Sequence, residues 1–494
     1  MHPDTVPPAI DYITKEIAAN RMEEVRFPKM ASPGVLVTKK DQSLRLCLSA
    51  ERINHNFIHI PLNLPNLNDI QSLISNTSIS WKFTTLDMKS AYRLIGLDDQ
   101  SSEFTTVSLP FGYFKSKCLV YGIAQNGILF YNTIKNLLKD VPRCTIYMDD
   151  ILIVTPEHDS SPIFQTLQIL QQNRLKINIH KSFFLQDSVM YLSYNVSNEG
   201  IRMNTEVANQ LAKMEKPTTT TDLRSLKGKI SYLRNFIGPC AAIYDKELGD
   251  MSEGVWSPKK NATLKKVQTA IREAKILNFF NPSTESLSLQ TWSEKEILAG
   301  ILWGKNITTN EYSLLNTFSR VMVKSEQNYP FIEKQALAAK EAFFYFEAFT
   351  RIHFTTLEIP DKTLVHMLKK RNVCANAQYS RILRWSLEME EFPHDVVYRD
   401  LHEKVFQMLN LSNHVKTTRI QSILKSKIMD TTKSFNRHRI PTTSTSRSLW
   451  RYQEPEVTIP TKTSSILEST HYTRWGLICI GETGPSKVCL SRCH

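Results

Sequence analysis

The stretch CTIYMDDILIV, residues 144–154, decides the fold of the first half of the chain. Two apolar runs rich in β-forming residues flank Asp149 and Asp150, which predicts a β-hairpin with two carboxylates at its turn. A bare Asp-Asp pair is more often an ordinary polar turn, because aspartate is a favoured turn residue. Acids elsewhere in the sequence therefore decide whether this turn is also a site.

A third acid ends a similar strand upstream. The run WKFTTLD, residues 81–87, predicts a strand that delivers Asp87 at its end, and Tyr92 follows five residues later. Three carboxylates that converge at strand ends repel one another unless divalent cations neutralise them. We therefore predict a site for two Mg²⁺ ions, with Mn²⁺ as an alternative, on Asp87, Asp149 and Asp150. Such a pair of ions supports in-line phosphoryl transfer.

Other elements are predicted around this core. Residues 34–38 and 44–48 favour a hairpin with lysines at its tip, and residues 128–138 have helical apolar spacing. After Pro217, Asp222 is predicted to cap an amphipathic helix whose apolar stripe is Leu223, Leu226, Ile230 and Leu233. Its basic residues are Arg224, Lys227, Lys229 and Arg234. From the pattern alone, a solvated helix face explains them better than a binding face does.

Composition excludes several classes of protein. The 494 residues imply roughly three domains, and 41% hydrophobic residues suffice for real cores, so a wholly disordered or fibrous chain is excluded. We expect no membrane span, no secretory leader, no disulfide scaffold and no Gly-rich phosphate loop. We therefore expect an intracellular protein that is cytoplasmic, with access to the nucleus as an open possibility. The net charge of +13 favours a polyanionic partner such as nucleic acid, with general solubility as the alternative.

The segments FTTLDMKSAY (83–92) and YMDD (147–150) together resemble the palm of reverse transcriptases, specifically those of gypsy-type LTR retrotransposons. Residues 31–41 are similar to the family's fingers hairpin, and residues 223–237 are similar to its first thumb helix. The resemblance spans about residues 25–410. It implies an α+β fold, a right-hand polymerase with fingers and palm at 1–210 and a thumb at 211–254. An RNase H-like α/β domain at 255–410 and a basic, disordered tail at 411–494 would follow.

The resemblance also implies roles for single residues. Lys39 and Arg45 would contact the incoming triphosphate, and Tyr92 would be the steric gate that collides with a ribose 2′-hydroxyl. Lys181 would protonate the leaving pyrophosphate, and Tyr121 and Gly122 would belong to the floor of the nucleotide pocket. A solvated hairpin, a core tyrosine and a surface lysine are the competing interpretations. The four basic residues of the thumb would touch nucleic acid.

Some positions depart from the family pattern. The pocket-floor segment VYGIAQNGILFY, residues 120–131, lacks both family prolines and has Tyr131 in place of a glutamine. The family's arginine after the second fingers strand is Glu51 here, and the glycine of the primer grip is Ser193. These changes leave open a second function, that of a catalytically impaired, retrotransposon-derived protein that binds nucleic acid or acts as a structural subunit.

The later region resembles the ribonuclease H domain of the same elements through LQTWS (289–293), YPFIEKQALA (329–338) and RILRWSLE (381–388). The family's four acids fall on Trp292, Gln335, Pro360 and Gln407, and Asp361 lies one residue from the third position. None of the four residues binds Mg²⁺ as a carboxylate would. The domain is predicted to be an inactive connection module, with a decaying gene as the alternative.

The leading hypothesis is an RNA-directed DNA polymerase. Its expected partners are an RNA template, a DNA primer, the RNA–DNA duplex and deoxynucleoside triphosphates, with no membrane, and a homo- or hetero-oligomer stays open. The chain is expected to be a fragment of a longer polyprotein or a shortened element. The tail, residues 411–494, contains 13 Lys and Arg residues but only five Asp and Glu residues. Most of the basic excess therefore lies there, where it can add salt-sensitive grip on nucleic acid or be only a solvated end.

Overall fold

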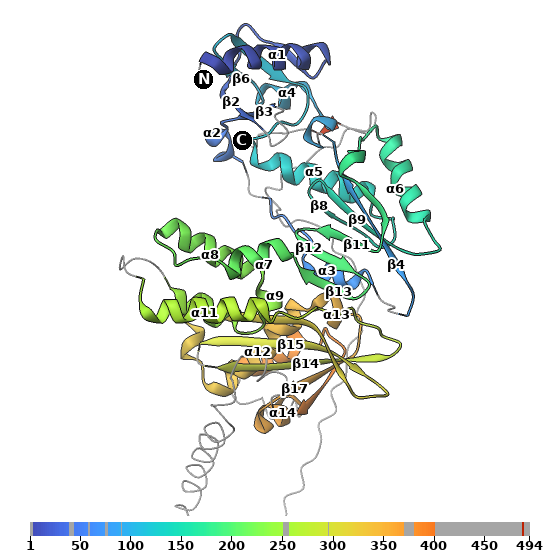
Figure 1. Cartoon of the computed structure of the whole chain (residues 1–494), viewed down its shortest axis with the longest axis vertical. Helices are drawn as coiled ribbons and strands as arrows, with labels where there is room; N and C mark the ends of the chain where they lie inside the picture. Colours follow the sequence, from blue (N-terminus) through green and yellow to red (C-terminus); the bar gives the residue numbers. More distant parts are fainter. Residues whose placement is uncertain are drawn as a thin grey trace, which may run out of the picture. The chain divides into compact units, whose positions relative to one another are not determined.

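The computed structural model describes residues 3–38, 44–57, 60–74, 78–89, 91–249, 256–294, 296–369, 380–400 and 487–488, all within one compact unit. Groups of strands and groups of helices follow one another through these ranges (Figure 1). No helix within them combines the length and the apolar content needed to cross a membrane. The predicted tail, except for the short strand β19 (Lys487–Val488), lies outside the described residues. That strand pairs in parallel with β5 (Gly96–Leu97).

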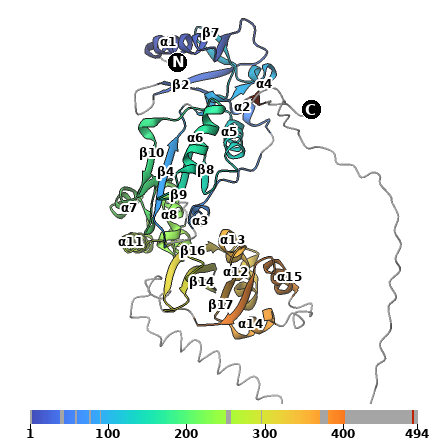
Figure 2. The same ribbon diagram turned by 90° about the vertical axis from the view of Figure 1, so that its right-hand side faces the viewer.

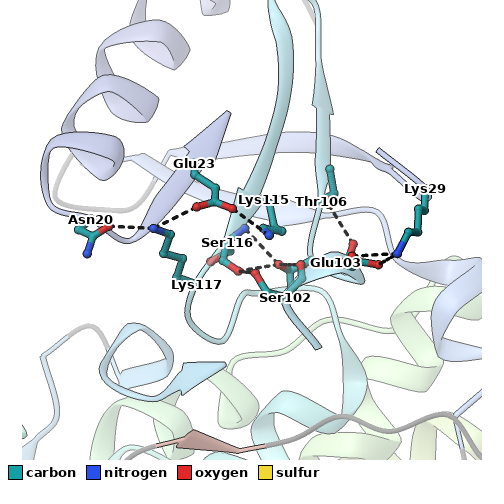
Figure 3. Close-up of polar contacts among 10 residues, drawn as sticks. Asn20, Glu23, Lys29, Ser102, Glu103, Thr106, Lys115, Ser116 and Lys117 are labelled. Atoms are coloured by element: carbon teal, nitrogen blue, oxygen red, sulfur yellow. Dashed lines mark hydrogen bonds and ion pairs between the residues drawn. The ribbon is translucent and has the colours of Figure 1, made fainter. Parts of the chain in front are cut away.

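An N-terminal sheet has the strand order β1-β7-β6-β2-β3. Its strands are β1 (Met22–Glu24), β2 (Ser32–Thr38), β3 (Leu44–Leu48), β6 (Val107–Leu109) and β7 (Gly112–Ser116), accompanied by η1 (Pro3–Thr5), α1 (Val6–Ala18), α2 (Glu51–Asn54) and α4 (Asp99–Glu103). The predicted hairpin is confirmed, because β2 and β3 pair antiparallel. Glu23 of β1 forms ion pairs with Lys115 of β7 at 2.8 Å and with Lys117, which follows β7, at 3.0 Å (Figure 3).

The second sheet, which we call the carboxylate sheet, has the order β10-β4-β9-β8. Its strands are β4 (Trp81–Asp87), β8 (Cys144–Tyr147), β9 (Asp150–Pro156) and β10 (Phe183–Gln186). The strand predicted at 81–87 and the hairpin predicted at 144–154 are confirmed. Helices α5 (Ala124–Leu137) and α6 (Ser161–Gln172) lie beside β8 and β9 (Figure 1), because their apolar faces share one core with Ile151 and Ile153. The helix predicted from residue 128 thus begins four residues earlier.

The opposite face of the carboxylate sheet packs on a second core. Leu152 and Val154 share it with a small sheet of β11 (Ser188–Tyr191), β12 (Tyr194–Ser197) and β13 (Gly200–Met203), and with a helical segment. The helices are α7 (Thr205–Ala212), α8 (Thr220–Tyr232), α9 (Arg234–Ile237), α10 (Ala241–Leu248) and α11 (Pro258–Arg272). Strand β9 is therefore held from both sides, by Ile151 and Ile153 on one face and by Leu152 and Val154 on the other.

Helix α8 contains three residues of the predicted apolar stripe, and the fourth, Leu233, is its C-cap; all four are buried. Its start differs from the prediction. Thr219 is the N-cap, and its side chain accepts a hydrogen bond from the backbone N–H of Asp222, whose carboxylate reaches back to the Thr219 N–H. This reciprocal capping box satisfies the backbone N–H groups of Thr219 and Asp222. The prediction placed the cap three residues too late.

A C-terminal sheet follows in the order β16-β15-β14-β17-β18. Its strands are β14 (Glu285–Glu294), β15 (Ile297–Asn306), β16 (Tyr312–Val321), β17 (Thr355–Ile359) and β18 (His394–Tyr398). The helical elements are η4 (Glu326–Asn328), α12 (Phe331–Tyr345), α13 (Glu347–Thr350), α14 (Lys362–Lys369) and α15 (Ser380–Met389). Figure 2 shows α12, α14 and α15 together beside β17, and these helices share one core with Leu287, Leu289 and Leu357.

Buried amides connect the C-terminal sheet to the rest of the compact unit. The Asn316 side chain in β16 donates to Asn68 at 2.5 Å and to Gln71 at 3.0 Å, both on α3 (Leu67–Ser72). Its oxygen accepts from Asn235 of α9 at 2.6 Å. All four side chains are buried. Because a buried amide that loses its partner is costly, this network fixes how α3, α9 and β16 pack together.

Candidate functional site

The three predicted aspartates lie at one end of the carboxylate sheet. Asp87 is the last residue of β4 and stands opposite Asp150, the first residue of β9. Asp149 occupies the turn between β8 and β9, and its carbonyl accepts a hydrogen bond from the backbone N–H of Met88 at 3.1 Å. Met148 completes the tight turn with a φ of +55°. Antiparallel pairing therefore brings the ends of two distant strands to the same place.

Electrostatics couple these carboxylates. Local desolvation, followed by the charges of Asp149 and Asp87, raises the pKa of Asp150 to about 6, although the residue keeps an exposed surface. Lys181, on the short helix η3 (Ile179–Lys181), opposes this rise. Lys181 is exposed, so its charge is available beside the acids. The structure thus brings Lys181 to the site at which the sequence predicted it.

Oxygen donors of this kind are the ligands that Mg²⁺ prefers. Burial is the largest cause of the raised pKa of Asp150, and the charges of Asp149 and Asp87 add to it; a bound divalent cation would offset this added repulsion. Within the described ranges, no three His, Cys, Asp or Glu side chains are gathered closely enough to form a ready cation cluster. The carboxylate oxygens of the three aspartates are therefore suitable ligands for Mg²⁺, but among the described residues they are not arranged as a preformed three-ligand site.

Three of the predicted nucleotide-binding residues form one continuous wall beside the acids. The guanidinium of Arg45, on β3, lies 4.2 Å from the centre of the Tyr121 ring. The Tyr121 ring is 4.7 Å from that of Tyr92, which is in turn 5.7 Å from that of Phe130 on α5. Burial, together with the charge of Asp149, raises the pKa of both tyrosines. The wall therefore extends from β3 to the carboxylates.

Arg45 has unused hydrogen-bonding capacity. Its Nε is buried and has no hydrogen-bond partner among the described residues. A guanidinium held on an aromatic face with a donor left over is suited to a phosphate oxygen, because arginine binds phosphate through several N–H groups at once. The second predicted phosphate contact, Lys39, lies outside the described residues.

Gly122 holds the floor of this wall against β3. It has a φ of +109°, and a Cβ built on it would lie 2.0 Å from the carbonyl oxygen of Leu48, so only glycine fits. The Asn54 side chain clamps the same turn, donating to the Gly122 carbonyl and accepting from the Ala124 N–H, both at 2.9 Å. Sequence reasoning missed Asn54, because a polar residue at the end of a four-residue helix carries no local signal.

The altered floor residues have internal roles. Asn126 donates to the Val120 carbonyl at 2.8 Å, and the buried Tyr131 donates to the Asn63 carbonyl at 3.0 Å. Gly127 stands where the family has its second proline. A Cβ built on Gly127 would lie 3.1 Å from the Tyr92 hydroxyl, so glycine at this position leaves space for the Tyr92 side chain. Ser193, in the turn between β11 and β12, adopts a φ of +61°, a conformation that favours glycine.

The four basic residues predicted on one helix face are not arranged as one face. Arg224 is exposed and Lys229 is half-buried on α8. Lys227 forms an ion pair with Asp245 at 3.4 Å and donates to the Gly249 carbonyl. Arg234 belongs to α9 and donates to the Ser319 carbonyl of β16 at 3.4 Å. Lys227 and Arg234 are therefore engaged within the chain, which the helical pattern did not predict.

The C-terminal sheet has neutral side chains where the family's acids were expected. Trp292 is buried in β14. Gln335 on α12 is buried and accepts from the Ser293 N–H at 3.1 Å while donating to the Ser293 carbonyl at 3.4 Å. Asp361 caps α14 by accepting from the Leu364 N–H at 2.9 Å. Pro360 follows β17, and Gln407 lies outside the described residues.

Comparison with known proteins agrees with this architecture. Residues 37–196 match the family model described as "Reverse transcriptase (RNA-dependent DNA polymerase)", and residues 256–357 match that of the "RNase H-like domain found in reverse transcriptase". Two similar proteins are the transposon Tf2-3 and Tf2-7 polyproteins of Schizosaccharomyces pombe, each 24% identical over 379 residues. The match covers 75% of this chain and 28% of each polyprotein.

Solved structures agree as well. The foamy viral protease–reverse transcriptase in complex with dsDNA is similar with a TM-score of 0.67 and 18% identity, covering 81% of this chain and 84% of that one. The same viral protein with an RNA/DNA hybrid gives a TM-score of 0.66 and 17% identity, covering 82% and 55%. The predicted α+β fold, a polymerase hand followed by an RNase H-like domain, and the predicted resemblance are both confirmed.

Proposed function

The chain belongs to the reverse transcriptase family and carries the RNase H-like domain found in these proteins, and on that premise we propose that it is an RNA-directed DNA polymerase. It would add deoxynucleotides to the 3′-hydroxyl of a DNA primer paired to an RNA template. The observation that carries the proposal is the strand register that sets Asp87 opposite Asp150, with Asp149 in the adjoining turn.

Asp87, Asp149 and Asp150 are the proposed holders of two Mg²⁺ ions, with Mn²⁺ as an alternative. Support comes from their shared strand end and from the charges of Asp149 and Asp87, which add to the effect of burial in raising the pKa of Asp150. When bound, such ions lower the pKa of an attacking hydroxyl and offset charge on the leaving oxygens. Replacing one carboxylate by an amide removes a ligand and a charge at almost constant volume.

The other residues would bind and orient the nucleotide. Arg45 would take the triphosphate through its unpartnered Nε, supported by its position on Tyr121, and Lys39 would assist from the hairpin tip. Tyr92 would exclude a ribose 2′-hydroxyl, Tyr121 and Gly122 would form the floor, and Lys181 would donate a proton to pyrophosphate. Arg224 and Lys229 remain the better candidates for duplex contact, because Lys227 and Arg234 have partners inside the chain.

The RNase H-like domain is proposed to be inactive and to support the template–primer duplex. Trp292, Gln335 and Pro360 offer no carboxylate, and the amide of Gln335 is already satisfied by Ser293. A domain without these acids would keep the surface that supports the duplex but would lose the ability to hydrolyse RNA.

Primer extension tests the polymerase. The purified full chain, an RNA template, a labelled DNA primer and all four deoxynucleotides are combined with Mg²⁺ or Mn²⁺. We expect extension by the wild type and a loss of at least ~10³-fold in Asp149→Asn, the scale of losing several kcal/mol of transition-state stabilisation. The matched control is Asp140→Asn, the same change at an exposed acid in the segment after α5.

Two outcomes would count against this proposal. Absence of extension by wild type with either ion, alongside measurable binding of the template–primer, would favour the second candidate, a nucleic-acid-binding protein without polymerase activity. The buried Tyr131, in place of the family's glutamine, is the observation that favours that candidate. Equal extension by Asp149→Asn and Asp140→Asn would show that the acids are wrongly assigned.

A cleavage assay tests separately whether the RNase H-like domain is inactive. The same preparation that extends a primer is given a labelled RNA annealed to DNA, and we expect no shortening of the RNA with Mg²⁺ or Mn²⁺. Cleavage that persists in Asp149→Asn would arise outside the polymerase site and would overturn the assignment of an inactive domain.

A further inference from the structure

A buried ion pair lies directly behind the proposed steric gate. Arg93 follows Tyr92 on the short 3₁₀ helix η2 (Ala91–Leu94), and its guanidinium contacts the carboxylate of Glu16 on α1. The Glu16 side chain is 8% exposed and that of Arg93 is 19% exposed. Helix α1 is thus joined to the segment that carries the gate, although the two lie far apart in sequence.

Glu16 is shared between two arginines. Arg21 donates to both carboxylate oxygens of Glu16, at 2.8 and 3.0 Å. Arg93, by contrast, has Glu16 as its only ion-pair partner in the described part of the chain, and its guanidinium also lies 5.1 Å from the centre of the Tyr12 ring. Loss of the Glu16 charge would leave the buried Arg93 without a counter-charge.

The geometry of η2 links Arg93 to Tyr92. A 3₁₀ helix has three residues per turn, so consecutive side chains point about 120° apart. Arg93 points toward α1, while the Tyr92 ring lies against Tyr121 and Phe130. Because η2 spans only four residues, holding one of these side chains limits rotation of the other.

The packing behind the gate is incomplete. Glu16, Arg93, Cys118 and Tyr121 contribute to the lining of a cavity of about 20 Å³, room for about one water molecule. Tyr121, whose ring contacts that of Tyr92, therefore borders this open space. Residues that border a void depend more strongly on their remaining contacts.

We propose that Glu16 is a positioning residue that, through Arg93, sets the Tyr92 ring and with it the discrimination between deoxyribonucleotides and ribonucleotides. The proposal rests on the proposed function, in which Tyr92 is the steric gate. A ring displaced by a fraction of an ångström would open space for a 2′-hydroxyl while leaving the carboxylates untouched.

Single-nucleotide incorporation measures this effect. The ratio of kcat/KM for dCTP to that for CTP is compared in wild type, Glu16→Gln and Arg93→Gln. We expect this ratio to fall about tenfold in both variants, because small misplacements of a positioning group change rates by that order. The change should come chiefly from a lower KM for CTP, with kcat for dCTP within about twofold of wild type. A merely structural defect would lower both rates together.

Arg21→Gln is the matched control. It removes the other arginine from the same carboxylate without touching η2, so its discrimination ratio should stay within about twofold of wild type. Glu16→Asp keeps the charge and should restore part of the ratio. If Glu16→Gln does not fold, Arg93→Lys keeps the charge but loses the planar guanidinium, and it should give a smaller fall in the same direction.

A spectroscopic readout separates this proposal from the polymerase assignment. With 3-fluorotyrosine at position 92, the ¹⁹F resonance should move in Glu16→Gln and stay unchanged in Arg21→Gln. If the wild type extends primers but neither the ratio nor the resonance changes in Glu16→Gln, the positioning role is wrong and the polymerase stands. If the wild type does not extend primers, the polymerase assignment fails, and the resonance alone decides whether Glu16 sets the ring.

Discussion

Acidic side chains have opposite surroundings in the carboxylate sheet and in the C-terminal sheet. In the first, three aspartates share one strand end, and their repulsion contributes to raising the pKa of Asp150 to about 6. In the second, the expected acid positions carry Trp292 and a satisfied Gln335, and nearby acids have internal partners. Buried Glu333 pairs with Arg381 at 2.8 Å, for example, and Asp361 caps a helix.

We interpret this difference as one between acids proposed to act in catalysis and acids that stabilise the fold. A carboxylate whose neighbours are like charges destabilises the fold unless a ligand joins it, so its presence points to a ligand. A carboxylate that accepts from an arginine or a backbone N–H already has its compensation. Mutation of these acidic positions should therefore have different effects in the two sheets. It should change activity in the carboxylate sheet and stability in the C-terminal sheet.

The largest expected effect is in the carboxylate sheet. Asp87→Asn should reduce primer extension by ~10³-fold or more. The melting temperature without added metal should stay the same or rise, because the substitution removes a charge that Asp149 and Asp150 repel. Extension assays and thermal melts in chelator measure the two effects. A melting temperature that falls by several degrees would mean that Asp87 stabilises the fold, and the comparison between the sheets would fail.

The next effect is in the C-terminal sheet. Gln335→Glu should lower the free energy of unfolding by about 2–3 kcal/mol, because a buried carboxylate replaces an amide that donates to the Ser293 carbonyl. It should leave primer extension within about twofold of wild type. Denaturant unfolding at neutral pH measures the loss. Gln335→Met, which removes both the donor and the acceptor for Ser293 but adds no charge, serves as the control; a larger loss in Gln335→Glu would identify the buried charge as the cause.

A smaller effect is expected at the helix cap in the same domain. Asp361→Ala should destabilise the protein by about 1 kcal/mol, because the Leu364 N–H loses its acceptor. Asp361→Asn should be close to neutral, because asparagine caps almost as well. Thermal melts distinguish the two. An equal loss in both variants would indicate that Asp361 acts through its charge and not as a cap.

The sequence predicted the parts of the site that depend on local pattern. The strands that end at Asp87 and begin at Asp150 are both strong runs of β-forming residues. The first has the predicted bounds, 81–87, whereas the second begins at Asp150, which was predicted to lie in the turn, and extends two residues past the predicted end, to Pro156. The register that pairs them depends on residues far apart in the chain. The stack of Arg45, Tyr121 and Tyr92 likewise combines three separate segments.

Other features were missed for similar reasons. The cap at Thr219 was overlooked because several threonines precede Asp222, and side-chain geometry alone chooses among them. The internal partners of Lys227 and Arg234 come from α10 and β16, which a helical pattern does not include. Tertiary contact, not helix periodicity, decided which basic residues remain available to a ligand.

The smallest expected effect is a pH dependence in the C-terminal sheet. Glu358 in β17 is buried, and burial raises its pKa although Arg399 lies 2.5 Å away and opposes the rise. A carboxyl whose folded-state pKa is raised holds its proton more tightly when folded, so stability falls as pH rises from the unfolded-state pKa through the folded-state pKa. Glu358→Gln removes this titration. The free energy of unfolding of the variant minus that of the wild type should therefore increase from about pH 4 to pH 8 and level off once the folded-state carboxyl has ionised. Denaturant melts at four pH values measure it, with Glu311→Gln, an exposed acid, as the control. A difference that decreases with pH would mean that attraction to Arg399 outweighs burial, making Glu358 a stabilising acid like Glu333 and strengthening the contrast with Asp150.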